Sequence, residues 1–321
     1  VVARGRAEGC VSGHFFIRYG ELGAHLRLRL RVAEGGADTT AELLLAHLRA
    51  CAPAADLPPR GAHASAAFDA PAAAPPWPAD HPPDGSAVSA LRWIPYQPEV
   101  ERYGGDALIG LAEALFEASS DAVLTLLPGP GDRTRAARLG RALLLTLVAF
   151  HAGADGRDSA ASLAGAYGAG YLSTVANGSR AQAASWEQAF ARGFAGQADA
   201  LRQQVETLWA RLDAEDALAE AGSPALAAYV TALRGARATL TERCAAGAVS
   251  VHGVAPRSWA ECARLLLPSH VHMTNNRLGI TIPEEAYLAH LIQWALAGES
   301  PPHGDSPHVA DVPVPSYAAL S

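Results

Sequence analysis

Eight residues that read Pro-Glu-Val-Glu-Arg-Tyr-Gly-Gly (98–105) concentrate groups that can exchange protons. Two carboxylates, Glu99 and Glu101, lie within five positions of a guanidinium, Arg102, and a phenol, Tyr103. A guanidinium beside a carboxylate favours its ionised form, so Arg102 could orient Glu99 and hold its charge. On spacing alone, a plain ion pair in a loop explains the segment as well. We predict that these four side chains are catalytic.

A second group of reactive side chains lies near the end of the sequence, in the run Ser-His-Val-His-Met-Thr-Asn-Asn-Arg-Leu-Gly (269–279). In an extended segment His270 and His272 would share a face, which would suggest a metal. No third ligand is close in sequence, so we expect no metal here. A single histidine acting as acid or base fits better, and we predict that Ser269 and His272 are catalytic.

A third feature is a run that alternates apolar and basic residues, His-Leu-Arg-Leu-Arg-Leu-Arg-Val (25–32). In a strand, alternate side chains point to opposite faces, so the arginines share one face at roughly 6.5–7 Å from one another. Guanidiniums this close repel unless water or anions lie between them. The run is therefore either a solvated sheet face or a clamp for carboxylates, to which the planar arginine fork is well matched.

The surrounding elements predict an α+β fold with a mixed sheet and a mostly helical middle region. We expect a hairpin over 14–32, a strand over 91–94 and a short strand over 249–254. Apolar residues at helical spacing predict helices over 38–50, 106–119, 134–151, 158–173, 181–212, 224–245 and 256–266. A last helix begins at the capping box Thr-Ile-Pro-Glu (281–284). We expect one domain over 1–300, with a Pro/Ala-rich insert at 52–88 and a disordered tail at 301–321.

Composition excludes several classes of protein. The sequence contains no lysine, which excludes a phosphate-binding loop of the Gly-Lys-Ser/Thr type and Schiff-base chemistry on a lysine. A net charge of −7 argues against a partner that is a nucleic acid. No apolar run of about 18 residues and no signal-peptide pattern occur, so we expect no membrane partner and a cytoplasmic protein. Four scattered cysteines predict buried free thiols, and we expect no cofactor.

Taken in order, three motifs resemble those of one protein family. They are Phe-Phe-Ile-Arg-Tyr followed by His-Leu-Arg-Leu-Arg (15–29), Tyr-x-Pro-Glu-x-x-Arg-Tyr-Gly-Gly (96–105) and Ser-x-x-His-Met-x-x-Asn-Arg-Leu-Gly (269–279). They are similar to the C-terminal domain of class I lantibiotic dehydratases and to the thiopeptide-type bacteriocin biosynthesis proteins. The match covers nearly the whole chain. It implies the fold of the elimination domain. It also implies a ribosomally made precursor peptide, with a leader and dehydroalanines, as the partner, and other enzymes of the pathway as candidate further partners.

The resemblance also implies roles for individual residues. In eliminating members an arginine pair, here Arg27 and Arg29, binds the glutamyl carboxylate, and Glu99, Arg102 and His272 complete the site. We expect further substrate contacts from motif residues in the first, second and third motifs, namely Arg18, Gln97, Asn276 and Arg277. The chain has Glu21-Leu22 where the family usually reads Asp-Pro, which departs from the eliminating members.

Two activities fit a stand-alone member that lacks the glutamylation module. One is a thiopeptide pyridine synthase, which joins two dehydroalanines by a formal [4+2] aza-cycloaddition and expels water and the leader peptide. The other is the glutamate-eliminating partner of a split dehydratase. We favour the synthase because of the altered turn and the long insert. A non-catalytic scaffold that presents the peptide is a third reading, against which the crowding of titratable groups counts.

Overall fold

The computed structural model describes residues 1–19, 25–51, 91, 96–127, 134–214 and 223–298 of the 321 residues. The chain divides into two compact units, Val1–Pro98 and Glu99–Ser321, and each is described by itself. The expected insert at 52–88 and tail at 301–321 lie outside the described residues, as does most of the expected strand at 91–94. A single domain over 1–300 stays a prediction.

The first unit contains the predicted hairpin. Strand β1 (Val11–Tyr19) pairs antiparallel with β2 (His25–Val32), between helices α1 (Val2–Ala7) and α2 (Ala37–Cys51). The expected fold class is confirmed, but β1 and β2 are the only strands among the described residues. The later strand expected over 249–254 is wrong: there Val251 and Val254 form only an isolated bridge. The segment is too short and too tightly turned to pair over several residues.

The two faces of the hairpin differ as the alternation predicts. Arg27 pairs across the strands with Ile17, and Arg29 with Phe15, so these side chains share a face. On the opposite face, His14 and Phe16 are buried. The arginine face therefore carries a row of charged and aromatic side chains, while the other face contributes to the core of the unit.

Every regular element described for the second unit is a helix. The helices are η1 (Val100–Tyr103), α4 (Ile109–Leu126), α5 (Arg135–Gly153), α6 (Arg157–Val175), α7 (Arg180–Ala195), α8 (Ala198–Asp213), α10 (Pro224–Ala245), α11 (Trp259–Leu278) and α12 (Ile282–Ala297). Side-chain hydroxyls cap α5, α7, α10 and α11 at their N-termini. The predicted capping box at Thr281 and Glu284 is present at the start of α12.

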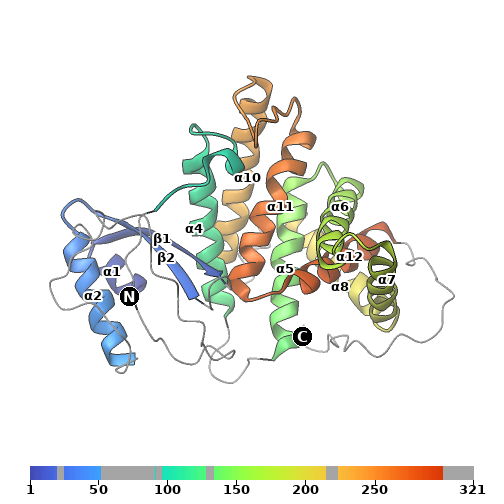
Figure 1. Ribbon diagram of the computed structural model, residues 1–321, viewed down its shortest axis with the longest axis horizontal. Helices are drawn as coiled ribbons and strands as arrows, with labels where there is room; N and C mark the ends of the chain where they lie inside the picture. The colour runs from blue at the N-terminus through green and yellow to red at the C-terminus, as the bar shows by residue number, and fades with distance from the viewer. Residues whose placement is uncertain (20–24, 52–90, 92–95, 128–133, 215–222, 299–321) are drawn as a thin grey trace. The chain divides into compact units, whose positions relative to one another are not determined.

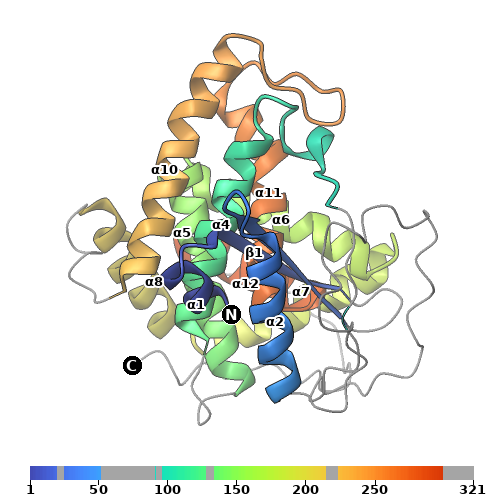
Figure 2. The ribbon, with the colours of Figure 1, turned by 90° about the vertical axis from the view of Figure 1, so that its left-hand side faces the viewer.

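Helices α4, α5, α10 and α11 run side by side, as Figures 1 and 2 show. Helix α12 packs against α6 and also contacts α5, α7 and α8. Twelve of its 16 residues are buried, so α12 is the central helix of this second group of helices. A helix that is buried on most sides lacks the strong one-sided pattern of a surface helix.

The helix expected over 106–119 is found over Ile109–Leu126 as α4, and two further helix predictions differ from the structure. The helix expected over 181–212 is two helices, because Gly196 and Gln197 interrupt it between α7 and α8. The helix expected over 256–266 continues through Pro268 to Leu278, so the segment containing His270 and His272 is helical and not extended. The two histidines therefore point to different sides of α11.

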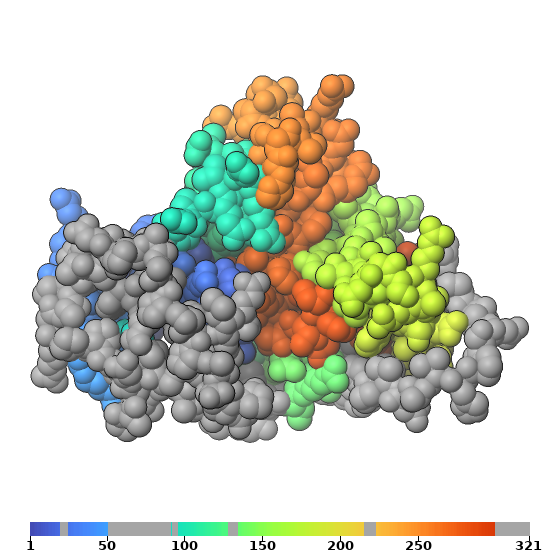
Figure 3. All heavy atoms as spheres, in the orientation of Figure 1, coloured from blue at the N-terminus to red at the C-terminus, as the bar shows by residue number. Residues whose placement is uncertain are grey.

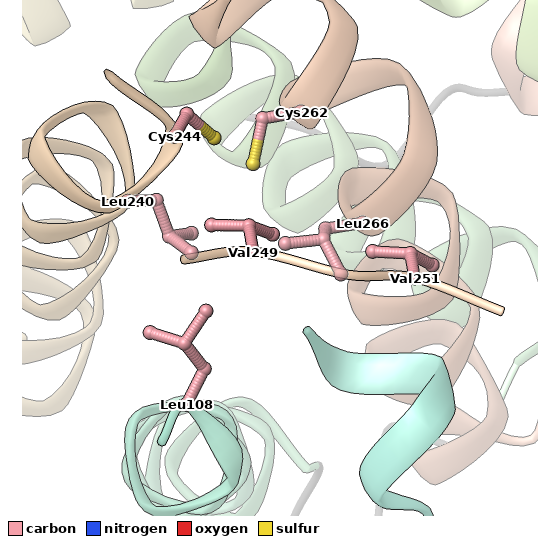
Figure 4. Packing of buried hydrophobic residues seen from close by; sticks show 7 residues of the cluster. All are labelled: Leu108, Leu240, Cys244, Val249, Val251, Cys262 and Leu266. Atoms are coloured by element: carbon pink, nitrogen blue, oxygen red, sulfur yellow. The ribbon is translucent and has the colours of Figure 1, made fainter. Parts of the chain in front are cut away.

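A buried cluster joins the start of α4 and the segment around Val249 and Val251 to α10 and α11. It comprises Leu108, Leu240, Cys244, Val249, Val251, Cys262 and Leu266 (Figure 4). The N–H groups of Ser250 and His252 donate to the carbonyls of Gly104 and Glu101, which holds the segment 249–254 against η1. Each large side chain buried here contributes about 1.5–3 kcal/mol to folding. The cluster therefore fixes the position of η1, which carries much of the second motif.

The described cysteines are buried free thiols, as predicted: Cys10, Cys244 and Cys262. Among the described residues, no helix is both long and apolar enough to cross a membrane.

Candidate active site

A buried carboxylate is at the centre of the candidate active site. Glu285 lies in the first turn of α12, and its side chain is fully buried. Burial raises the pKa of Glu285, and hydrogen bonds involving His272 and Tyr167 only partly oppose this. The N-terminus of a helix favours a negative charge, so α12 also stabilises the carboxylate. A buried acid whose pKa is raised by burial and lowered by specific hydrogen bonds is typical of a functional site.

A tight reversal of the chain brings this carboxylate to helix α11. Gly279 ends α11 with a φ of 75°, a conformation that glycine adopts without strain. The N–H of Ile280 then donates to the carbonyl of Asn275 at 3.1 Å, and Thr281 begins α12. Glu285 consequently lies beside His272, thirteen positions earlier in the sequence.

Both oxygens of the Glu285 carboxylate are hydrogen bonded. Oε1 lies 2.9 Å from Nδ1 of His272, and Oε2 accepts from the hydroxyl of Tyr167. Since Nδ1 faces the carboxylate, Nε2 is the ring nitrogen left for proton exchange with a ligand. The side chain of His272 is 21% exposed, whereas that of Glu285 is 0% exposed. A carboxylate behind an imidazole fixes its orientation and tautomer, as in hydrolase triads.

A second tyrosine covers the imidazole. The ring of Tyr171 stacks on His272 with centroids 5.5 Å apart, and it contacts Tyr167 one helical turn earlier, at 4.7 Å. Burial, followed by the nearby charge of Glu285, raises the pKa of Tyr171. The phenol therefore stays protonated at neutral pH and can act as a hydrogen-bond donor.

Arg102 connects the second and third sequence motifs. Its Nη1 donates to Oε2 of Glu99 at 3.0 Å, and its Nε donates to Oγ of Ser269 at 3.0 Å. Burial alone would lower the pKa of Arg102, but Tyr103 and Glu99 raise it. The charge of Arg102 opposes the rise in the pKa of Tyr171 without outweighing it. The predicted Glu99–Arg102 pair and Ser269 are thus together in the structure.

The other side of α11 faces the core. His270 lies against Tyr103 and Phe116, with ring centroids 5.2 and 5.5 Å away, and burial lowers its pKa to about 3. Arg277 is 1% exposed and donates to Oγ of Ser119 at 3.0 Å. Burial lowers the pKa of Arg277 to about 10, so it still carries a charge at neutral pH. The surroundings of Arg277 and Tyr103 are those of structural groups of the core.

The remaining predicted residues lie elsewhere. Glu101 is exposed on η1, and Asn276 is half-buried on α11. Arg18, Arg27, Arg29 and Gln97 belong to the first unit. Among the described residues, no group of three His, Cys, Asp or Glu side chains is arranged to hold a metal ion.

Within the first unit, Arg27 and Arg29 are paired with aromatic rings. The guanidinium carbon of Arg27 lies 3.8 Å from the ring centroid of Tyr19, and that of Arg29 lies 5.2 Å from Tyr96. Nε of Arg27 also donates to Nε2 of His25 at 3.2 Å. Burial, followed by the charge of Arg27, lowers the pKa of Arg29. An anion on this face would relieve that repulsion.

Sequence reasoning missed three members of the site: Tyr167, Tyr171 and Glu285. The tyrosines lie four positions apart on a predicted helix, a spacing that places them on one face. Glu285 directly follows Glu284, which completes the capping box, so the capping box does not account for the second carboxylate. The spacing of the two tyrosines and the unexplained second carboxylate are the sequence patterns that could have revealed these members of the site.

A pocket of about 300 Å³ adjoins the site on the side of α6. Tyr167 and Tyr171 line it, together with Leu267 and Pro268 of α11. Figure 3 shows α11 at the surface of the unit, between the teal segment of η1 and α4 and the yellow-green helix α6. The acid–base groups therefore lie beside a space that a ligand can enter.

Comparison with known proteins assigns this arrangement to a family. The chain belongs to the lantibiotic biosynthesis dehydratase C-terminal family, whose model matches residues 1–296. Enzymes of this family modify ribosomally made precursor peptides, so the chain is a peptide-modifying enzyme. No curated protein sequence matches the chain.

Two solved structures are similar to the chain. The crystal structure of TsrL matches with a TM-score of 0.60 and 16% sequence identity, over 92% of this chain and 87% of TsrL. The tRNA dependent lantibiotic dehydratase MibB from Microbispora sp. 107891 matches with a TM-score of 0.47 and 22% identity, over 92% of this chain but only 26% of MibB. The likeness to TsrL supports the fold at this low identity.

Proposed function

We propose that the protein is a thiopeptide pyridine synthase that joins two dehydroalanines of a precursor peptide and releases the leader peptide. The observation that carries the proposal is the Glu285–His272 pair, stacked against Tyr171 and next to an open pocket. This arrangement supplies proton transfer and peptide binding, which are the two requirements of the reaction.

The chemistry needs acid–base groups more than any other assistance. One backbone amide must become its iminol tautomer, and two carbon–carbon bonds then close a six-membered ring that keeps one double bond. Loss of water and of the leader as a carboxamide adds the other two double bonds and makes the ring aromatic. The tautomerisation and both eliminations move a proton, while alignment of the two alkenes for ring closure is an entropic task for the pocket.

The residues of the site have distinct roles in this proposal. His272 accepts the amide proton at Nε2 and delivers it to the amide oxygen to give the iminol, and Glu285 stabilises the imidazolium that forms in between. In each later elimination the imidazole takes a ring C–H proton and passes it to the departing group, which leaves as water or as the leader carboxamide. Tyr171, which stays protonated, donates a hydrogen bond to the iminol oxygen. Arg102 holds the hydroxyl of Ser269 for a second contact with the reacting amide. Glu99 holds Arg102 in turn.

Elimination of glutamate from a glutamylated serine is the second candidate function. The observation that favours it is the half-buried arginine face of the first unit, where Arg27 and Arg29 repel one another. A glutamyl carboxylate bound on this face would relieve the repulsion.

One mass-spectrometric experiment separates the two candidates. The purified protein is incubated alone with a leader-bearing peptide that contains two suitably spaced dehydroalanines. The synthase releases a leader carboxamide and a core product with pyridine-like ultraviolet absorption. A parallel incubation uses a glutamylated serine peptide in the same buffer. Unchanged dehydroalanine peptide together with loss of glutamate from the second peptide would replace the synthase with the eliminating enzyme.

A further inference from the structure

The pocket beside the candidate active site has a mostly apolar wall that includes three aromatic rings. Phe150 of α5, Leu163, Tyr167 and Tyr171 of α6, and Leu267 and Pro268 of α11 line it. Its volume of about 300 Å³ is at the small end of the range for ligand pockets. It is therefore suited to one large side chain and not to a folded segment of peptide.

Small residues and a proline account for the pocket. Gly170 faces it from α6, where a Cβ atom would meet no other atom within 4 Å. On α11, Pro268 has no N–H group, so the carbonyl of Arg264 loses its usual helical donor. This carbonyl can accept a hydrogen bond from the backbone of a bound peptide.

One charged side chain lies at the rim of the pocket. The side chain of Arg264 is exposed at the rim, and it makes no ion pair within the part of the chain that the structure describes. Its guanidinium can donate to peptide carbonyls outside the pocket. Apart from Arg264 and Thr174, the side chains that line the pocket are apolar or aromatic, so burial of a charged side chain against them would be costly.

We infer that this pocket binds one large uncharged side chain of the peptide substrate, aromatic or aliphatic, next to the residue that reacts. The inference rests on the proposed function for the position of the reacting residue, because Tyr171 both lines the pocket and stacks on His272. The pocket is thereby the determinant that selects which position of a precursor peptide enters the active site.

The test measures binding of three small probes to the full-length protein by ligand-observed NMR titration. The probes are N-acetyl-phenylalanyl-dehydroalanine methylamide and its analogues with alanine or aspartate in place of phenylalanine. Burial of the phenyl group predicts that the phenylalanine probe binds at least about tenfold more tightly than the alanine probe. The aspartate probe is expected to bind no better than the alanine probe.

Two glycine substitutions provide a matched pair. Gly170→Leu fills the pocket, and Gly235→Leu places the same side chain on α10, where a Cβ atom also meets nothing within 4 Å. Both positions are exposed and lie inside helices, so both substitutions favour the helix to a similar degree. We expect Gly170→Leu to abolish the preference for phenylalanine and Gly235→Leu to keep it.

Equal affinity of the wild-type protein for the three probes would overturn the inference, as would undetectable binding of the phenylalanine probe. An unchanged preference in Gly170→Leu would also overturn it. None of these measurements requires turnover, so failure of pyridine formation and failure of the pocket assignment are separate results. A phenylalanine preference without pyridine formation would sustain the pocket and remove the synthase.

Discussion

Helix α11 presents two histidines, two positions apart, to opposite environments. His270 lies among Tyr103 and Phe116 in the core, and burial lowers its pKa to about 3. His272 faces Glu285 and Tyr171 and remains partly exposed. Both belong to the same motif, so residue type and sequence position do not separate them. The Glu285 carboxylate on α12 distinguishes the two histidines, because it holds the imidazole of His272 in a fixed orientation beside a pocket.

The two faces of α11 also differ in the groups that pair with their arginines. Arg277 on the core face is 1% exposed and bonds to the neutral hydroxyl of Ser119. Arg102, near the other face, is paired with Glu99 and retains contact with solvent. The core face therefore uses polar groups to fix one packing arrangement, whereas the other face keeps polar groups within reach of a ligand.

The largest effect on the rate is expected from substitution of Glu285, the carboxylate that is hydrogen bonded to His272. Glu285→Gln keeps the size of the side chain but removes the charge that orients His272. We expect the rate of product formation to fall by about 10²–10⁴-fold, measured by mass spectrometry with saturating peptide.

The neighbouring carboxylate provides the control for this substitution. Glu284 caps α12 through Thr281 and pairs with Arg135 at 2.6 Å. Glu284→Gln is expected to lower the melting temperature by a few degrees and to leave the rate nearly intact. Equal loss of rate in the two variants would show that the fold of the turn, and not the charge of Glu285, is what matters.

The comparison of the two histidines leads to the next prediction. His272→Phe retains a ring that can stack on Tyr171 but cannot transfer a proton, so the rate should fall by about 100-fold or more. His270→Phe replaces an aromatic ring by another in an aromatic cluster, so the rate should change little. Circular dichroism would verify that both variants are folded. A larger loss of rate in His270→Phe would reverse the assignment of the two faces.

Much of the fold could be predicted from local patterns. The helix over 224–245 begins and ends where its apolar spacing predicts, because Ser223 caps it and Pro224 opens it. The helix expected to end near 266 runs on to Leu278, since burial on several sides of α11 outweighs the helix-breaking tendency of Pro268. Tertiary packing of this kind has no local signature.

The candidate site was only partly predictable for the same reason. Glu99 and Arg102 are three positions apart, so their pairing follows from spacing. The contact between Glu285 and Tyr167 joins helices 118 positions apart, and no local rule brings such residues together. Resemblance to a family identified the motifs, whereas the packing of α6, α11 and α12 determined which motif residues meet.

The third prediction concerns the pH dependence of folding. The pKa of His270 is lower in the folded protein, about 3, than in the unfolded chain, about 6.5. The unfolded state therefore binds more protons between these values, and stability falls as the pH falls through this window. Between pH 7 and pH 5, His270 should remove about 2 kcal/mol from the free energy of unfolding.

Chemical denaturation of wild type and His270→Phe at both pH values measures this contribution. Other titrating groups, including the buried His290, are common to the two proteins and cancel in the comparison. The loss of stability on acidification should be smaller in the variant by about the predicted 2 kcal/mol. Parallel pH profiles would show that His270 is as easily protonated in the folded protein as in the unfolded chain.

A smaller effect is expected at the hydroxyl that Arg102 holds. Ser269→Ala removes one hydrogen-bonding group from the reacting amide without exposing a new surface. We expect kcat/KM to fall about tenfold and the melting temperature to change little. Ser269→Thr, which restores a hydroxyl group, should recover part of the activity. Full activity of Ser269→Ala would restrict the site to Glu285, His272 and Tyr171.

The smallest expected effect is at the outer end of the same chain of contacts. The Glu99 side chain is 50% exposed, and exposed ion pairs contribute at most about 1 kcal/mol. Glu99→Gln should therefore lower kcat/KM by no more than about fivefold, and added salt should reduce the wild-type rate toward that of the variant. A loss as large as that in Glu285→Gln would make Glu99 a proton-transfer group itself. The half-exposed carboxylate would then share the role assigned to the buried one, and the contrast between the two faces of α11 would no longer mark the active site.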